Sequence, residues 1–273
     1  FDENGINHTL FFKEGSTYYL VYTGRNASTE FQIGLATSSS PLSGYTKDGS
    51  NPIISLADLN VPLSKTYDFI QTQALVKVGS TYYIFLTCGD IGGADASDIV
   101  MMSGNSLTNF ANPVIKLTLA STPIKSYLVG TTANRDTNGW PQFCRSLQIG
   151  GIHRYGGKIV AMIASGTGSD ELVTAKSTVI FALIADDDGN FNFKCIGNDL
   201  LIDTGGTSTW NKTMSYNPDI LKDDNLSLTP KVVGSNNVIY FAGLGTTAEA
   251  INTKGQTGFA YAPNKRIVKK LLN

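Results

Sequence analysis

The feature that most constrains the fold is a hairpin that recurs along the chain. Residues 10–24 and 74–89 each contain an apolar strand, a turn and a second apolar strand, and both carry the sequence Lys-x-Gly-Ser-Thr-Tyr-Tyr. Residues 151–166 and 230–243 repeat this pattern with other turn sequences. A glycine-containing turn between two apolar segments is typical of a β-hairpin. Its recurrence predicts a repeat architecture.

The spacing of the hairpins predicts how many strands each unit holds. Equivalent positions in successive units lie 64, 76 and 80 residues apart: Tyr18, Tyr82, Lys158 and Val238. This leaves room for two more strands per unit, and segments of strand character follow the hairpins at 31–38, 98–103, 177–184 and 257–262. Because no stretch between strands shows ten residues of helical periodicity, a parallel α/β fold is excluded. We predict an all-β fold, a β-propeller of four-stranded antiparallel blades.

Composition and charge exclude two classes of partner. The chain carries 21 Lys and Arg against 22 Asp and Glu, a net charge of -1, and its longest basic clusters are the pairs 265–266 and 269–270. We therefore expect no nucleic-acid partner. Hydrophobic residues make up 41% of the chain without a long apolar run, so we expect no membrane insertion. Residues 1–273 are expected to form a single domain, excised from a longer chain because Phe1 is not an initiator.

Metal and cofactor signals are weak. With two histidines and no Cys-x-x-Cys spacing a zinc site is not expected, and the three cysteines are predicted to be unpaired: Cys88, Cys144 and Cys195. The run 186–190, Asp-Asp-Asp-Gly-Asn, has oxygen ligands that suit calcium, but an Asp-Gly between apolar segments is more simply a hairpin turn. We expect no cofactor and no metal.

Four segments together suggest a family. Residues 13–24, 33–38, 41–44 (Pro-Leu-Ser-Gly) and 51–54 (Asn-Pro-Ile-Ile) resemble the first blade of furanosidase-type propellers. These are glycoside hydrolase families 43, 32 and 68 and their relatives, including the family 130 phosphorylases. The resemblance is best over 5–54, fair over 68–103 and faint beyond. It implies a five-bladed propeller, with a fifth blade in segments such as 107–135 or 186–228; four blades are the alternative.

The resemblance also implies three carboxylates in an axial funnel, because glycoside hydrolysis needs an acid and a base or nucleophile. The first carboxylate position, ten residues before Tyr18, falls on His8. The family's second-blade pattern Trp-Ala-Pro-Asp falls on Gln71, Thr72, Gln73 and Ala74, so the second carboxylate position is Ala74. The general acid falls on Gln148, or on Arg145 or Ser146 if the alignment shifts. None of these residues is an acid.

Further residues complete the predicted ligand-binding set. Trp140 and Trp210 lie in Gly-, Thr- and Asn-rich loops and can stack on sugar rings, with inter-blade packing as the alternative. Together with these two tryptophans, the ligand-binding residues are predicted to be His8, Gln71, Gln73, Arg145 and Gln148. Polar side chains at inner-strand positions can instead hydrogen-bond neighbouring blades.

The sequence therefore favours a carbohydrate-recognising propeller that is glycosidase-like in fold and lacks hydrolytic activity. Its partner would be a glycan or cell-surface polysaccharide, as in a receptor-binding module of a phage tail or a surface adhesin, located outside the cell or on a virion. The alternative is an active glycoside hydrolase of the family 43/32-like class on a furanose- or pentose-containing polysaccharide, with acids from Asp2, Asp68, Asp136 or Asp219. A third possibility is a purely architectural propeller that mediates protein contacts.

Overall fold

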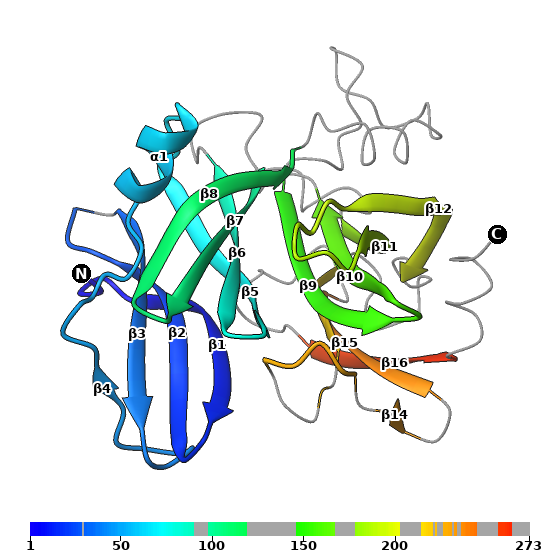
Figure 1. Cartoon of the computed structure of the whole chain (residues 1–273), viewed down its shortest axis with the longest axis horizontal. Helices are drawn as coiled ribbons and strands as arrows, with labels where there is room; N and C mark the ends of the chain where they lie inside the picture. Colours follow the sequence, from blue (N-terminus) through cyan, green and yellow to red (C-terminus); the bar gives the residue numbers. More distant parts are fainter. Residues whose placement is uncertain are drawn as a thin grey trace. The chain divides into compact units, whose positions relative to one another are not determined.

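The computed structural model consists almost entirely of β-strands (Figure 1). It describes residues 1–28, 30–89, 98–118, 146–166, 178–202, 214–220, 222, 226–230, 232–233, 236–244 and 256–263. The chain divides into two compact units. The first unit comprises residues 1–116 and 223–228, and the second comprises residues 117–222 and 229–273. No helix in the described part of the chain has the length and apolar character that a membrane crossing needs.

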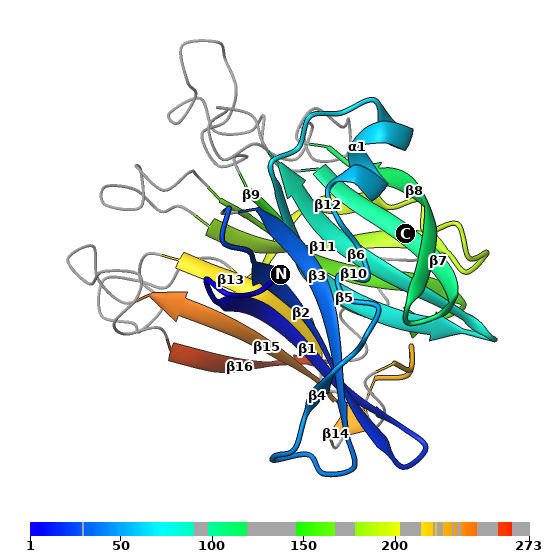
Figure 2. The same ribbon diagram turned by 90° about the vertical axis from the view of Figure 1, so that its left-hand side faces the viewer.

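The first unit contains two four-stranded antiparallel sheets, each with its strands in chain order (Figures 1 and 2). The strands of the first sheet are β1 (Ile6–Glu14), β2 (Thr17–Arg25), β3 (Phe31–Ser38) and β4 (Thr46–Lys47). The strands of the second sheet are β5 (Phe69–Val78), β6 (Thr81–Gly89), β7 (Asp98–Ser106) and β8 (Asn109–Leu117). In the sequence, one short helix, α1 (Ala57–Leu63), connects the first sheet to the second.

The repeated hairpins form as predicted. The Tyr-Tyr pairs at 18–19 and 82–83 occupy β2 and β6, the second strands of two different sheets. The two turns that precede them each place a glycine in the left-handed region, Gly15 at φ 59° and Gly79 at φ 60°. Glycine has no Cβ to clash in this conformation, which explains why the motif needs it there.

The core of the first unit lies between its two sheets. Alternate residues of each strand point to opposite faces, so one face of β1 and β2 packs toward the second sheet. Phe12 is 1% exposed there and stacks on Tyr19, with ring centroids 5.1 Å apart. Leu226 packs into the same core, and its carbonyl accepts a hydrogen bond from the Lys77 N–H at 3.0 Å. The segment 223–228 therefore belongs to this unit, although most of its sequence neighbours do not.

The second unit repeats the strand pattern. One set of strands is β9 (Ser146–Tyr155), β10 (Lys158–Gly166), β11 (Thr178–Asp186) and β12 (Lys194–Ile202), paired antiparallel in chain order. The other is β13 (Met214–Ile220), β14 (Val232–Val233), β15 (Asn236–Leu244) and β16 (Gln256–Pro263). The predicted third-strand segments thus correspond to β3, β7, β11 and β16.

The fourth hairpin differs from its sequence prediction. Its first strand was expected within 230–233, but β15 pairs mainly with β13 and only two residues of β14 continue that pairing. A bridge between Lys222 and Pro230 closes the intervening loop. An insertion therefore splits the first strand of this unit into β13 and β14. The contiguous hairpin pattern in the sequence includes β14 alone.

Two segments that were reserved for a fifth blade contain outer strands instead. β8 covers residues 109–117 and β12 covers residues 194–202, as the fourth strands of the second and third sets. The run 186–190 is the turn between β11 and β12, as predicted from its Asp-Gly sequence. The Asp188 carboxylate accepts a hydrogen bond from the Asn190 N–H at 2.8 Å in that turn.

Candidate functional site

Every first strand carries an irregularity in the middle of its pairing with the second strand. The register shifts after Asn7 in β1, after Thr72 in β5, between Gly150 and His153 in β9, and after Tyr216 in β13. Such bulges bend a strand and re-aim its side chains, and they occur often beside active sites. In β1 the extra residue is His8, and in β5 it is Gln73. Two of the predicted ligand-binding residues therefore occupy bulges, and the two bulges lie one residue apart when the hairpins are aligned on their Lys-x-Gly-Ser-Thr-Tyr-Tyr motifs.

The backbone at His8 is strained. Its φ is 38°, in the left-handed region that costs residues with a Cβ roughly 1–2 kcal/mol. The bulge of β9 places Gly151 at φ 57°, where glycine avoids that cost. A histidine held in a conformation that glycine would adopt more readily indicates that its side chain is needed there.

A polar network surrounds His8 in the first unit. The Thr72 hydroxyl donates to the His8 carbonyl at 2.7 Å, and the Thr72 N–H donates to Thr23 Oγ1 at 3.0 Å. Gln73 Nε2 donates to Gln71 Oε1 at 3.2 Å. Thr23, Gln71 and Thr72 are buried polar residues. The Thr72 bonds join β5 to β1 and β2 at His8 and Thr23, and the bonded pair Gln71 and Gln73 lies on β5 on either side of Thr72.

The imidazole in this network is neutral at physiological pH. Burial lowers the pKa of His8 to about 4, although a hydrogen bond with the Thr72 backbone acts in the opposite direction. A neutral imidazole both donates and accepts one hydrogen bond. The amides of Gln71 and Gln73 likewise donate and accept. This chemistry suits hydroxyl groups and supplies no paired carboxylates.

The acids proposed for a hydrolase lie elsewhere. Asp2 accepts the Tyr22 hydroxyl at 2.9 Å and the Lys47 ammonium at 2.7 Å, one on each carboxylate oxygen. Burial alone would raise the pKa of Asp2, but these two donors lower it. Phe1 beside it stacks on Tyr22 and fills the space over Gly34, where a Cβ would lie 2.2 Å from the Phe1 ring. Asp2 thus fastens the first residues onto the first sheet.

Asp68 lies exposed just before β5, and its N–H donates to the Gly89 carbonyl at 3.0 Å. Another acid that the sequence did not single out, Asp98, begins β7 in the same unit. Its carboxylate accepts the Tyr67 hydroxyl at 2.5 Å and lies 3.2 Å from the Lys65 ammonium. Hydrogen bonding and charge pairing therefore occupy both Asp2 and Asp98.

In the second unit, Gln148 lies on β9 opposite Ala164, three residues before the bulge. At the bulge, Asp219 Oδ1 accepts the N–H groups of Gly151 at 3.2 Å and Ile220 at 2.8 Å. This contact ties β13 to β9. Asp219, one of the acids proposed for a hydrolase, lies within β13.

The other histidine of the chain lies near the same bulge. His153 is 2% exposed, and its Nδ1 donates to the Gly151 carbonyl at 2.6 Å. Burial lowers the pKa of His153 to about 4, and nearby Lys222 lowers it further, against the raising effect of the Gly151 bond. Its Nε2 is buried without a hydrogen-bond partner. The sequence did not predict a role for this residue.

The remaining predicted residues lie outside the described part of the chain: Asp136, Trp140, Arg145, Trp210 and Cys144. Cys88 is a free thiol buried in the first core. Within the described ranges, no three His, Cys, Asp or Glu side chains are placed to hold a metal ion. In the turn after β11, Asp186 pairs with Lys158 and Asp187 pairs with Arg154.

Sequence reasoning missed Thr23 and Thr72 as site residues. Threonine is common in strands, and no motif distinguishes these two from the others. Their role depends on β5 lying against β1 and β2, which brings together residues 49 positions apart in the sequence.

The fold is similar to those of solved carbohydrate-active propellers. The structure matches a thermostable family-43 glycoside hydrolase with a TM-score of 0.64 at 11% identity, over 94% of this chain and 71% of that one. It matches α-L-arabinofuranosidase from Lactobacillus brevis with a TM-score of 0.62 at 7% identity, over 93% and 71% of the two chains. No protein-family model and no curated protein sequence matches the chain.

A third match is β-1,2-mannobiose phosphorylase from Listeria innocua in complex with β-1,2-mannobiose, with a TM-score of 0.58 at 10% identity. It covers 98% of this chain and 60% of that one, so this chain spans well under two thirds of that protein. Identities this low show the fold alone. The predicted all-β propeller and its resemblance to furanosidase-type propellers are thereby confirmed.

Proposed function

We propose that this protein is a carbohydrate-binding propeller whose ligand site lies at the bulges of β1 and β5 and does not hydrolyse its ligand. The observation that carries the proposal is the cluster of partly exposed His8 and Gln73 with buried Gln71 and Thr72, in which Thr72 binds the His8 carbonyl and Gln73 binds Gln71, in a propeller of glycoside-hydrolase type. Sugars present many hydroxyl groups, and these residues offer both donors and acceptors. The ligand is a neutral or weakly charged glycan.

The absence of hydrolysis follows from the identity of the bulge residues. Glycoside hydrolysis needs two carboxyl groups about 5–10 Å apart, one of which protonates the leaving oxygen. His8 and Ala74 stand at the positions where the family resemblance places the first two carboxylates, and Gln73 directly precedes the second. Neither an amide nor an imidazole with a pKa of about 4 can protonate a glycosidic oxygen efficiently near neutral pH.

The wider setting belongs to the same proposal. A glycan-binding propeller without hydrolytic activity suits the surface-recognition module of an adhesin or a phage tail, which would meet its polysaccharide outside the cell. A purely architectural role would leave the strain at His8 without a purpose. A hydrolase remains the second outcome of the tests below.

The first test combines a glycan array with titration calorimetry on the best ligand. Gln73→Ala and His8→Ala should each weaken binding by roughly two- to twelvefold, because a lost hydrogen bond costs about 0.5–1.5 kcal/mol. Gln32→Ala is the matched control, since Gln32 is a partly buried glutamine on β3 outside the network. If Gln73→Ala and His8→Ala both bind like the wild type, the ligand site lies elsewhere.

The second test measures sugar release from the same glycans over long incubations. No release is expected from the wild-type protein. Release that disappears in Asp2→Asn, Asp68→Asn or Asp136→Asn would contradict the proposal and establish the hydrolase.

A further inference from the structure

The repeated motif occurs in two different surroundings within the first unit. In the first copy Lys13 pairs across the hairpin with Tyr18, and in the second copy Lys77 pairs with Tyr82 in the same register. Each lysine ammonium lies over the ring of its tyrosine, 5.1 Å from the centroid in the first copy and 4.5 Å in the second. The same sequence thus builds the same cation–π pair twice.

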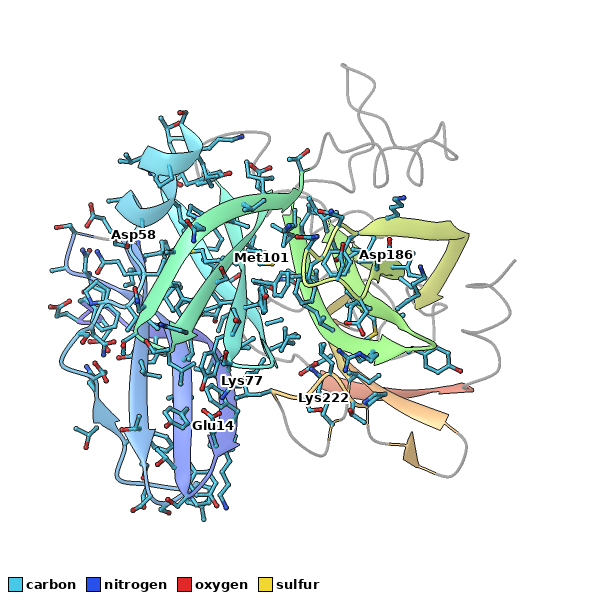
Figure 3. The ribbon with its side chains drawn as sticks, viewed as in Figure 1. Glu14, Asp58, Lys77, Met101, Asp186 and Lys222 are labelled. Carbon is cyan, nitrogen blue, oxygen red and sulfur yellow. The ribbon has the colours of Figure 1, made fainter. Side chains whose placement is uncertain are left out.

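In the second copy this pair binds a carboxylate. Glu14, at the end of β1, receives the Lys77 ammonium on Oε1 and the Tyr82 hydroxyl on Oε2 at 2.5 Å (Figure 3). Lys77 also donates to the Tyr82 hydroxyl at 3.0 Å. Burial would raise the pKa of Glu14, but the hydrogen bonds from Lys77 and Tyr82 lower it. The Lys–Tyr pair of this motif is therefore a carboxylate clamp.

In the first copy the clamp has no carboxylate. No acidic side chain in the described ranges forms an ion pair with Lys13. The neighbouring position on the same strand face shows the same contrast: Phe11 is 42% exposed, whereas its counterpart Leu75 is 6% exposed under the first sheet. The face of β1 that carries Phe11 and Lys13 is open to solvent.

The other repeats do not supply the missing group. Glu14 is the residue that follows the motif lysine, and its counterparts in the later repeats are Val78, Tyr155 and Val233. None of these is an acid. Within the described part of the chain no acid fills the first clamp, so the clamp is able to receive a carboxylate from a ligand.

An aromatic surface lies next to the open clamp. The rings of Phe11 and Tyr18 are 6.0 Å apart between centroids and inclined by only 18°. The exposed Phe11 ring and the partly buried Tyr18 ring present an apolar surface on which the C–H face of a sugar can stack, beside a cation that can bind its charged group.

We propose that Lys13 and Tyr18 form a carboxylate-binding site for an acidic saccharide, with the uronate carboxylate on the Lys13 ammonium and the Tyr18 hydroxyl and the sugar ring on Phe11 and Tyr18. The site is separate from the network around His8. The inference rests on the proposed carbohydrate function for its class of ligand and on the Glu14 clamp for its chemistry.

The test compares trigalacturonate with its methyl ester, which removes the charge and keeps the sugar, by titration calorimetry at low and moderate salt. The wild-type protein should bind the acid more tightly than the ester. Lys13→Met should weaken binding of the acid by roughly three- to tenfold and remove its salt dependence, and Tyr18→Phe should weaken it less. Lys194→Met, which changes an exposed lysine on β12, is the matched control and should have no effect.

Each outcome decides between the two proposals. If Lys13→Met binds the acid like the wild type while Gln73→Ala weakens glycan binding, this inference is wrong and the proposed function stands. If the acid binds through Lys13 while no neutral glycan depends on His8 or Gln73, this inference stands alone. If sedimentation shows that the wild type dimerises and Lys13→Met does not, a carboxylate of a second copy fills the clamp and the saccharide inference is overturned.

Discussion

The bulge of β1 and the bulge of β9 solve the same backbone problem with different residues. Both strands place a residue in the left-handed region at this point, but β9 uses Gly151 and β1 uses His8. At Gly151 the Met162 side chain occupies the space that a side chain would need, because a Cβ would lie 2.0 Å from the Met162 methyl carbon. At His8 the strained residue carries a large polar side chain into a hydrogen-bonded network. The bulge of β1 therefore positions the His8 side chain, and the bulge of β9 allows Met162 to pack closely against the backbone.

The two histidines extend this contrast. His153 is buried near the glycine bulge and binds the Gly151 carbonyl, so it serves the structure of the second unit. His8 lies partly exposed at its bulge, beside amides that can reach a ligand. Nevertheless burial keeps both imidazoles neutral. This shared property gives the largest predicted effect on the free energy of unfolding.

Acid should destabilise the protein through both histidines. Each has a folded-state pKa of about 4, below the usual 6.5, so the unfolded chain binds more protons between these values. The stabilisation is complete above pH 6.5 and is lost as the pH falls toward 4. By pH 4.5 a fully buried histidine has lost about 2–3 kcal/mol. Urea unfolding of wild type and His153→Leu at pH 7 and 4.5 should show a smaller pH effect in the variant by about this amount. An unchanged pH effect would contradict the neutral, buried state of His153.

The two bulges should respond in opposite ways to exchange of their residues. Gly151→Ala should cost about 2 kcal/mol, since it adds left-handed strain and displaces Met162. His8→Gly should change stability by less than about 1 kcal/mol, because relief of strain offsets the lost side-chain contacts, while glycan binding weakens by roughly two- to twelvefold as in His8→Ala. Denaturant unfolding and calorimetry measure both. A loss of stability in His8→Gly as large as in Gly151→Ala would show that His8 is structural.

The smallest effect should come from the residue that holds His8. Thr72→Val keeps the shape of the side chain and removes the hydroxyl that donates to the His8 carbonyl, at a cost of about 1 kcal/mol. Glycan affinity should fall about twofold to threefold, because the backbone that orients His8 is less restrained. Thr37→Val on β3 is the control. Equal affinity in Thr72→Val and wild type would show that this hydrogen bond does not position the site.

Most of the fold could be predicted from local signals. The turns at Gly15 and Gly79 and the Tyr-Tyr strands after them specify hairpins through interactions between near neighbours in the chain. The third strands were recognisable for the same reason. The split first strand of the fourth unit was not, because β13 pairs with β15 across an insertion that no local pattern reveals.

The candidate site also has features that the sequence predicts and features that only the tertiary structure decides. The sequence alone predicted that residues without a carboxylate stand at the family's acid positions and that His8, Gln71 and Gln73 offer hydrogen bonds to a ligand. Only the tertiary structure decided that His8 is strained, that Thr72 of another sheet holds it, and that Glu14 fills one Lys–Tyr clamp while the other stays open. Hairpins form between neighbours in sequence, whereas these contacts join residues more than 60 positions apart and exist only once the two sheets pack.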